Sequence, residues 1–249
     1  MKKKPVIIAV CVLIVVLVRL FTPYLGRPFI LYCDHGERKG FILSTSIKKI
    51  DINSAYDPCL RFVKYCPKLE MIDVSGYSEK NLDHISNPNL KSIIISGDCA
   101  NWSSLNKCTE LEYLNILHGN FQTVEDISGL EKLRVLHIVA PASEFSLNKL
   151  NELKNLYWLQ IVCDNDIDCE YFSQLEKLDS LDLSTYGKIT GLDKLDSVTS
   201  LILHHPNEEV EKDICGMDSL RELKVYGTKF SDEVDRELEE KHVSVKYIE

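Results

Sequence analysis

The stretch Leu111-Glu112-Tyr113-Leu114-Asn115-Ile116 contains the pattern that decides the fold, because its first, fourth and sixth residues are apolar. The same pattern recurs about every 22 residues along most of the chain. Its copies begin at Ile47, Leu69, Leu90, Leu111, Leu133, Leu156, Leu178, Val198 and Leu220, with a worn last copy at Val243. This periodicity indicates a chain built from one repeated structural unit.

The spacing within a unit predicts its local structure. The fourth and sixth positions lie two residues apart, so they face one side of a short strand. Two more apolar columns stand six and three residues before the first position, as Leu150 and Leu153 stand before Leu156. Only the copy with His84 and Asn87 breaks these columns. Their three-residue spacing is typical of a helical or 3₁₀ return.

A single unit cannot bury its own apolar face, whereas stacked units share a continuous core. We therefore expect parallel strands about 4.8 Å apart, which form a sheet roughly 45 Å long over ten copies.

On motifs such as 111–116 and 178–183, the chain resembles the leucine-rich-repeat family, and its period is similar to that of the bacterial internalin type. The resemblance covers residues 47–248. It implies an α/β solenoid with a curved parallel sheet on the concave side and short helical or 3₁₀ returns on the convex side. It also implies that the protein binds a protein or peptide partner. The asparagine that follows the strand in this family is present only at Asn120, Asn165 and Asn207, one place late.

The residues that alternate with the core positions are expected to point out of the concave face. They are mostly polar in the outer copies, but the three middle copies differ and predict a contiguous, largely apolar partner-binding patch. The alternatives are a segment that covers the patch and a register displaced by one residue. The patch consists of Tyr113, Asn115, Leu117, Val135, His137, Val139, Trp158, Gln160 and Val162.

Residues 1–25 are typical of a membrane segment. Lys2, Lys3 and Lys4 precede an uninterrupted apolar run, and residues 5–25 supply the roughly 20 residues that a bilayer requires. The run alone also has the length of a signal-peptide core, which would be removed. No small-x-small cleavage sequence follows it, which favours an uncleaved anchor. The lysines favour a single-pass cell-membrane protein whose repeats lie outside the cytoplasm.

The rest of the chain is predicted to form one solenoid with a cap at each end. Residues 26–46 are predicted to form a linker and an N-terminal cap, in which the apolar stretches 29–32 and 41–43 pair as a hairpin. Residues 47–230 form the solenoid. In residues 231–249, Ser231 begins a cap helix with Val234 and Leu238 on one face, and a last strand follows.

Charge and motifs exclude several functions. Residues 1–28 contain five basic residues and no acidic one, which leaves 24 of the 29 basic residues against all 38 acidic residues in the rest of the chain. Such a body repels nucleic-acid phosphates. We find no catalytic motif, no spacing for a metal site and no sequence for a cofactor, so we expect a protein that is not an enzyme.

Most of the nine cysteines have simple structural explanations. Cys66 and Cys108 occupy a column that leucine otherwise fills, which predicts buried thiols. An exported domain can form disulfides, and Cys163 with Cys169 is the pair to inspect.

Two functions from different classes remain. The first is recognition of a protein or peptide partner on the concave face. The second is a structural role in which the solenoid associates with itself in an envelope scaffold. Loss of binding with Trp158→Asp would support the first, whereas association through a solenoid end would survive that substitution.

Overall fold

A computed structural model of the chain describes residues 29–34, 37–42, 46–51, 63, 65–75, 80–118, 121–139 and 146–249, and of residues 29–42 it describes the backbone alone. The predicted membrane segment 1–25 lies outside this part of the chain. Within the described residues, no helix is long and apolar enough to cross a membrane.

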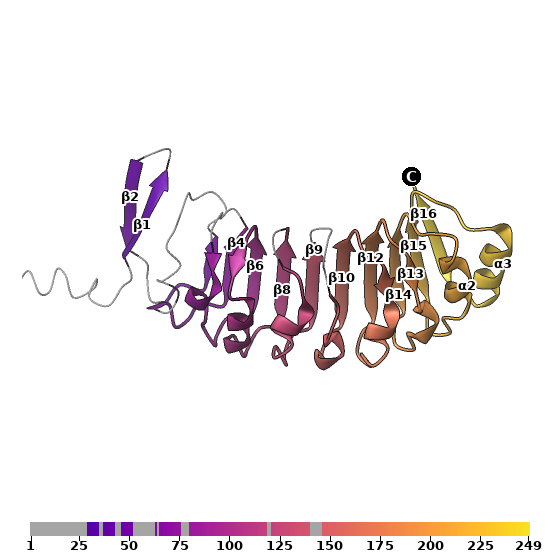
Figure 1. Ribbon diagram of the computed structural model, residues 1–249, viewed down its shortest axis with the longest axis horizontal. Coiled ribbons are helices and arrows are strands. Elements are labelled where there is room, and N and C mark those ends of the chain that lie inside the picture. The colour runs from indigo at the N-terminus through magenta and orange to yellow at the C-terminus, as the bar shows by residue number, and fades with distance from the viewer. Residues whose placement is uncertain are drawn as a thin grey trace, which may run out of the picture.

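All ten copies of the motif form strands of one parallel sheet, and the strands stand side by side in chain order (Figure 1). The sequence prediction of a parallel solenoid sheet is therefore confirmed. The strands are β3 (Lys49–Asp51), β4 (Met71–Val74), β6 (Ser92–Ser96), β8 (Tyr113–Leu117), β9 (Val135–Val139), β10 (Trp158–Cys163), β12 (Ser180–Thr185), β14 (Ser200–His204), β15 (Glu222–Tyr226) and β16 (Ser244–Ile248).

The register joins equivalent positions of successive copies. Leu114 pairs with Leu136, which pairs with Leu159 on the next strand. These residues are fully buried, while the residues between them are partly exposed. A slip by one residue would turn the whole apolar set outward, so the hydrophobic pattern fixes this register. The alternative of a displaced register is wrong.

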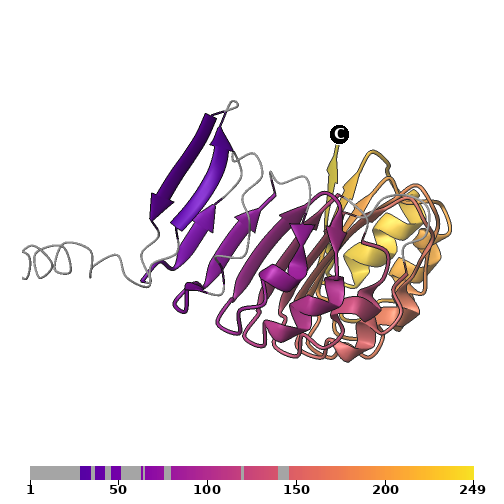
Figure 2. The same ribbon diagram turned by 60° about the vertical axis from the view of Figure 1, so that its left-hand side comes forward.

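The returns lie along the other side of the core, where the view in Figure 2 shows them as a row of short helical turns. The predicted core columns are buried there, as Leu150 and Leu153 show. In the part of the chain that the structure describes in full, six returns contain a 3₁₀ helix and the last two contain an α-helix. The 3₁₀ helices span Leu82–His84, Trp102–Lys107, Val124–Ile127, Leu150–Glu152, Cys169–Phe172 and Leu192–Lys194, and the α-helices are α2 (Val210–Cys215) and α3 (Asp232–Glu240).

Short strands in the returns also pair in parallel. β5 (Lys80–Asn81) pairs with β7 (Cys99–Ala100), and β11 (Ile167–Asp168) pairs with β13 (Ile189–Thr190). They join neighbouring returns much as the main sheet joins neighbouring strands.

The copy that breaks the apolar columns is accommodated by an asparagine. Asn87 is buried, and its Nδ2 donates to the Val63 and Cys66 carbonyl oxygens at 3.4 and 3.0 Å. Its Oδ1 accepts from the Asn89 amide at 3.0 Å. These hydrogen bonds offset the cost of placing a polar side chain in the core column.

Both ends carry the elements that the sequence suggested. β1 (Phe29–Asp34) and β2 (Glu37–Ile42) form an antiparallel hairpin, although the assignment of this hairpin as a cap stays a prediction. At the other end, Ser231 precedes α3, whose Val234 and Leu238 are buried. The last strand, β16, pairs with β15 in parallel.

Candidate functional site on the concave face

The nine predicted patch residues form a three-by-three grid on the concave face, which we define as the face of the ten-stranded sheet opposite the core. Each row crosses β8, β9 and β10 in exact strand pairing. We call this set the central grid. Its rows are Tyr113, Val135 and Trp158, then Asn115, His137 and Gln160, then Leu117, Val139 and Val162.

The central grid is accessible. Trp158 is 38% exposed, and the other eight side chains are partly exposed. The grid residues point away from the core because their neighbours along each strand, such as Leu136 and Ile138, are buried. The loop segments 119–120 and 140–145, which could bear on the covering alternative, lie outside the described residues.

Three rings are stacked edge to face across the grid. The His137 ring centroid lies 5.5 Å from that of Tyr113 and 4.7 Å from that of Trp158. The Tyr113 hydroxyl accepts a hydrogen bond from Asn115 Nδ2 at 3.3 Å. These contacts hold the rings in defined positions, as edge-to-face packing of π-systems favours.

His137 is partly buried at the centre of the grid, where burial disfavours its charged form. Burial lowers the pKa of the His137 imidazole, against the opposing charge of Asp182. Its Nε2 is buried and has no hydrogen-bond partner, and the same is true of Asn115 Oδ1 on the neighbouring strand. The centre of the grid thus contains two buried polar atoms without a hydrogen-bond partner.

A polar network adjoins the grid on its C-terminal side, and the sequence reading missed it. Gln160 Nε2 donates to Asp182 Oδ2 at 2.8 Å, and Asp182 Oδ1 lies 3.2 Å from His204 Nε2. The His204 ring stacks on Tyr226, with centroids 4.4 Å apart and planes at 6°. Gln160 and Asp182 share one position of adjacent repeats, so their contact could have been read from the repeat alignment.

Asp182 is an unusual residue for this surface because only 7% of it is exposed. Burial raises the pKa of the Asp182 carboxyl, although His204, Gln160 and His137 each favour its charged form. Desolvation therefore outweighs the partners that the protein supplies.

A groove of about 720 Å³ runs along the end of the sheet where the strands begin. Its lining includes Glu112, Arg134 and Tyr157, which directly precede the first row of the central grid. The Tyr157 side chain is 46% exposed. The groove extends the surface that a ligand on the grid could contact.

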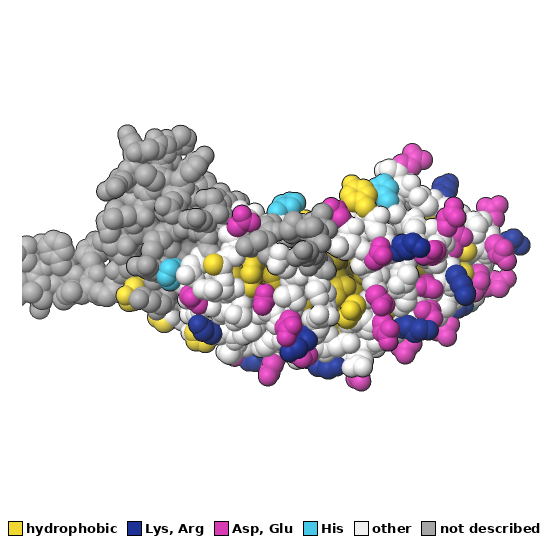
Figure 3. Space-filling view, viewed as in Figure 1, with side chains coloured by type: hydrophobic (Ala, Val, Ile, Leu, Met, Phe, Trp, Pro, Cys, Tyr) yellow, Lys and Arg dark blue, Asp and Glu magenta, His cyan; other side chains and the backbone are white. Residues whose placement is uncertain are grey.

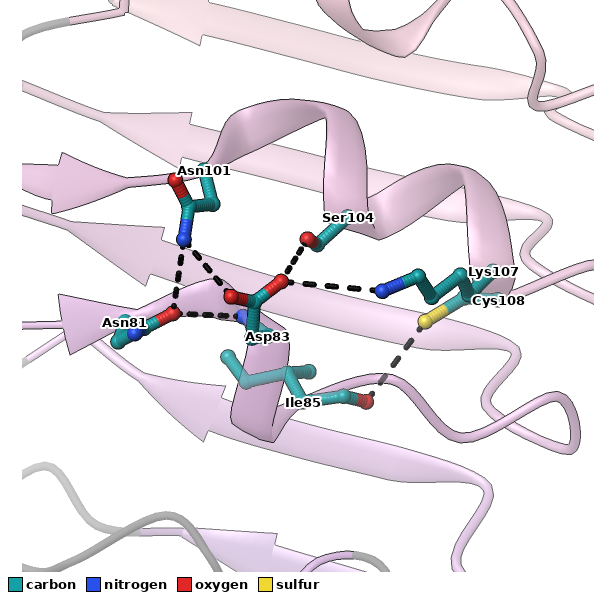
Figure 4. Close-up of polar contacts among 7 residues, drawn as sticks. All are labelled: Asn81, Asp83, Ile85, Asn101, Ser104, Lys107 and Cys108. Atoms are coloured by element: carbon teal, nitrogen blue, oxygen red, sulfur yellow. Dashed lines mark hydrogen bonds and ion pairs between the residues drawn. The ribbon is translucent and has the colours of Figure 1, made fainter.

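Other polar clusters have structural roles. Figure 4 shows Asp83 on the convex side, where it accepts hydrogen bonds from Ser104 and from Asn101 Nδ2 and lies 3.7 Å from Lys107 Nζ. The Ser104 hydrogen bond is the largest cause of the lowered pKa of Asp83. Because these partners belong to the next repeat, the cluster ties two returns together.

The described residues bring together neither a cluster of metal ligands nor the cysteine pair that the sequence suggested. No group of three or more His, Cys, Asp and Glu side chains in that part of the chain is placed to hold a metal ion. Cys163 and Cys169, the pair singled out for a disulfide, are separate buried thiols. Cys66 and Cys108 are buried as predicted, and burial raises the pKa of both thiols.

Solved structures share this architecture. The chain is similar to an internalin (inlF) from Listeria monocytogenes, with a TM-score of 0.65 and 19% sequence identity over 84% of this chain and 63% of that one. It is also similar to internalin C2 from the same organism, with a TM-score of 0.54 and 14% identity over 77% and 85% of the two chains. The chain thus spans less than two thirds of the length of the first.

Comparison by sequence alone gives no relatives. No protein-family model matches the chain, and no curated protein matches it. The structural likeness shows the fold, which is an α/β leucine-rich-repeat solenoid.

Proposed function

We propose that this solenoid binds a protein or peptide partner through the central grid. The observation that carries the proposal is a change from polar to apolar side chains along the concave face. Serines occupy outer-row positions on both sides of the grid, at Ser92 and Ser96 on β6 and at Ser180 and Ser184 on β12, while the three strands between them present apolar and aromatic side chains.

The size and chemistry of the surface suit such a partner. A standard interface buries about 800 Å² on each partner, and a face roughly 45 Å long can supply it. Tyr113 and Trp158 are of the residue types that most often anchor interfaces. Charged side chains gather instead over the C-terminal repeats and their helices, at the right of Figure 3.

We further propose that residues 5–25 tether the protein in the cell membrane as a single span, with the repeats outside the cytoplasm and no enzymatic activity of their own. The apolar run behind Lys2, Lys3 and Lys4 supports the tether and its orientation. Membrane fractionation should recover the full-length mass in the membrane pellet. Protease added to intact cells should remove the repeats, and recovery in the soluble fraction would contradict the tether.

The test of the binding function is capture of a partner by cross-linking to the full chain. Trp158→Asp and the double variant Tyr113→Asp/Trp158→Asp should lose the captured partner. The matched control is Tyr171→Asp, because Tyr171 is 40% exposed on the 3₁₀ helix Cys169–Phe172 of a return, away from the sheet. Melting temperatures of all variants must show that they are folded.

The expected loss of affinity for Trp158→Asp is about 30-fold or more, the effect of removing an interface anchor. If the wild type and Trp158→Asp capture the partner equally, the binding surface lies outside the central grid.

A scaffold formed by self-association is the second candidate. β16 ends the ten-stranded sheet, so one edge of its backbone faces away from β15. Such an edge can pair with another strand. Sedimentation of the full chain should then give a dimer or larger species that Trp158→Asp leaves intact. A monomer at all concentrations would contradict the scaffold.

A further inference from the structure

The concave face has a distinct charge pattern over the central grid and its neighbours. On the seven strands of the ten-stranded sheet that run from β4 to β14, the residues that point to this face include Asp73 and Asp182 but no lysine or arginine. Basic residues lie at the two ends of this face, at Lys49 on β3 and at Lys224 and Lys246 on β15 and β16. On these strands a ligand therefore meets carboxylates and neutral groups, while the groove at the start of the strands adds Lys132, Arg134 and Lys177.

Among the described residues, Asp182 has no lysine or arginine partner. Its two oxygens face Gln160, which is neutral, and His204, which is charged only when protonated. A buried carboxylate without a lysine or arginine partner is costly, and a cation that arrives with a ligand would offset that cost.

Asp182 lies nearly buried at the concave face, with 10% of its side chain exposed, and its direct strand neighbours are Gln160 and Ile202. Small residues, Ser180 and Ser184, lie on either side of it along β12, and Ser200 lies on β14. Rings lie on the flanking strands: Trp158 on β10 pairs with Ser180, and His204 on β14, which contacts Asp182 and stacks on Tyr226, pairs with Ser184. Ring faces attract ammonium and guanidinium groups.

We propose that the partner presents a lysine or arginine side chain to Asp182, between Trp158 and the His204–Tyr226 stack. This inference rests on the proposed function, because the same bound segment would place its apolar residues on the central grid. β12 lies two strands beyond β9, the middle strand of the grid, or about 10 Å away. An extended segment covers that distance in about three residues, so the basic residue should lie about three positions from an apolar one.

The probe is a phage-displayed library of random 12-residue peptides, selected on the full chain in non-ionic detergent. Peptides that still bind Tyr113→Asp/Trp158→Asp are discarded, since they do not depend on the grid. The peptides that remain should contain a lysine or arginine about three positions from an aromatic or aliphatic residue.

Two matched variants then isolate the carboxylate. Asp182→Asn and Asp73→Asn each remove one acidic charge from the concave face, but only the first adjoins the grid. For a selected peptide, Asp182→Asn should weaken binding about tenfold or more, whereas Asp73→Asn should change it less than about twofold. Replacement of the basic residue of the peptide by glutamine should remove the difference between the wild type and Asp182→Asn.

The outcomes separate the two claims. Grid-dependent peptides with no basic residue, or an equal response to Asp182→Asn and Asp73→Asn, would overturn the inference and leave the proposed function in place. Selection that yields no grid-dependent peptide would count against both. Thermal melting of Asp182→Asn shows that its effect on binding does not come from unfolding.

Discussion

Strands β8, β9 and β10 and strands β12 and β14 belong to one sheet and have the same core and the same register, but they present different surfaces. On both sets the inward residues, such as Leu136 and Leu181, are almost fully buried. The outward residues form an apolar and aromatic grid on the first set and a polar network around Asp182 on the second. The comparison teaches that the core columns determine the fold, while the outward positions are free to vary with function.

The largest expected effect separates the inward and outward positions of one strand. Leu136→Ala on β9 should lower the free energy of unfolding by about 2–5 kcal/mol, because it leaves a cavity in a fully buried site. Val135→Ala, one residue away and partly exposed, should cost less than about 1 kcal/mol. Denaturant unfolding measures both. Equal losses of unfolding free energy would contradict the assignment of Leu136 to the core and of Val135 to the concave face.

A smaller effect on stability is expected at Asn87, the polar residue in a core column. Asn87→Ala should lower the free energy of unfolding by about 1–2 kcal/mol, since it removes hydrogen bonds to Val63 and Cys66. Ser86→Ala is the control, because the Ser86 hydroxyl is buried without a hydrogen-bond partner. It should change stability by less than about 0.5 kcal/mol. If the two variants unfold alike, the hydrogen bonds of Asn87 do not stabilise this repeat.

The smallest effect concerns the pH dependence of the polar network. Burial raises the pKa of Asp182, so the folded protein binds this proton more readily than the unfolded chain does. The charged carboxylate therefore destabilises the fold above its raised pKa, and the cost disappears as the pH falls towards 3.8, the ordinary value.

Asp182→Asn should accordingly stabilise the protein at pH 7, by an amount on the order of 1 kcal/mol. The gain should vanish below about pH 3.8. Thermal melting across this pH range measures it. A variant that is less stable than the wild type at pH 7 would show that the contacts with Gln160 and His204 outweigh desolvation.

Most of the fold could be predicted from the sequence, because each repeat contains the same pattern of apolar residues. The Leu and Ile columns determine which side of a strand is buried, and the constant period aligns equivalent positions on adjacent strands. That alignment also predicted the central grid, since it requires only strand alternation and repeat order. The role of Asn87 was missed because its hydrogen bonds reach loop carbonyls of the preceding repeat, which no column describes.

The polar network was missed for another reason. Asp182 was taken as part of an ordinary polar flank, because two serines accompany it on β12. Its polar contacts come from Gln160 and His204 on the two neighbouring strands, and His204 reaches it diagonally across the sheet. Diagonal contacts depend on side-chain rotamers, and a repeat pattern does not predict rotamers.

The measurement that tests the binding surface most directly is photo-cross-linking from single positions. A photoreactive phenylalanine analogue is placed at position 158 on the central grid or at position 171 on the opposite side, in the full chain expressed in its own cells. These two positions have similar exposure, 38% and 40%, so unspecific reaction should be alike. A discrete adduct from position 158 that is absent from position 171 is the predicted result. Equal adducts from both positions, or an adduct from position 171 alone, would contradict a binding function for the central grid.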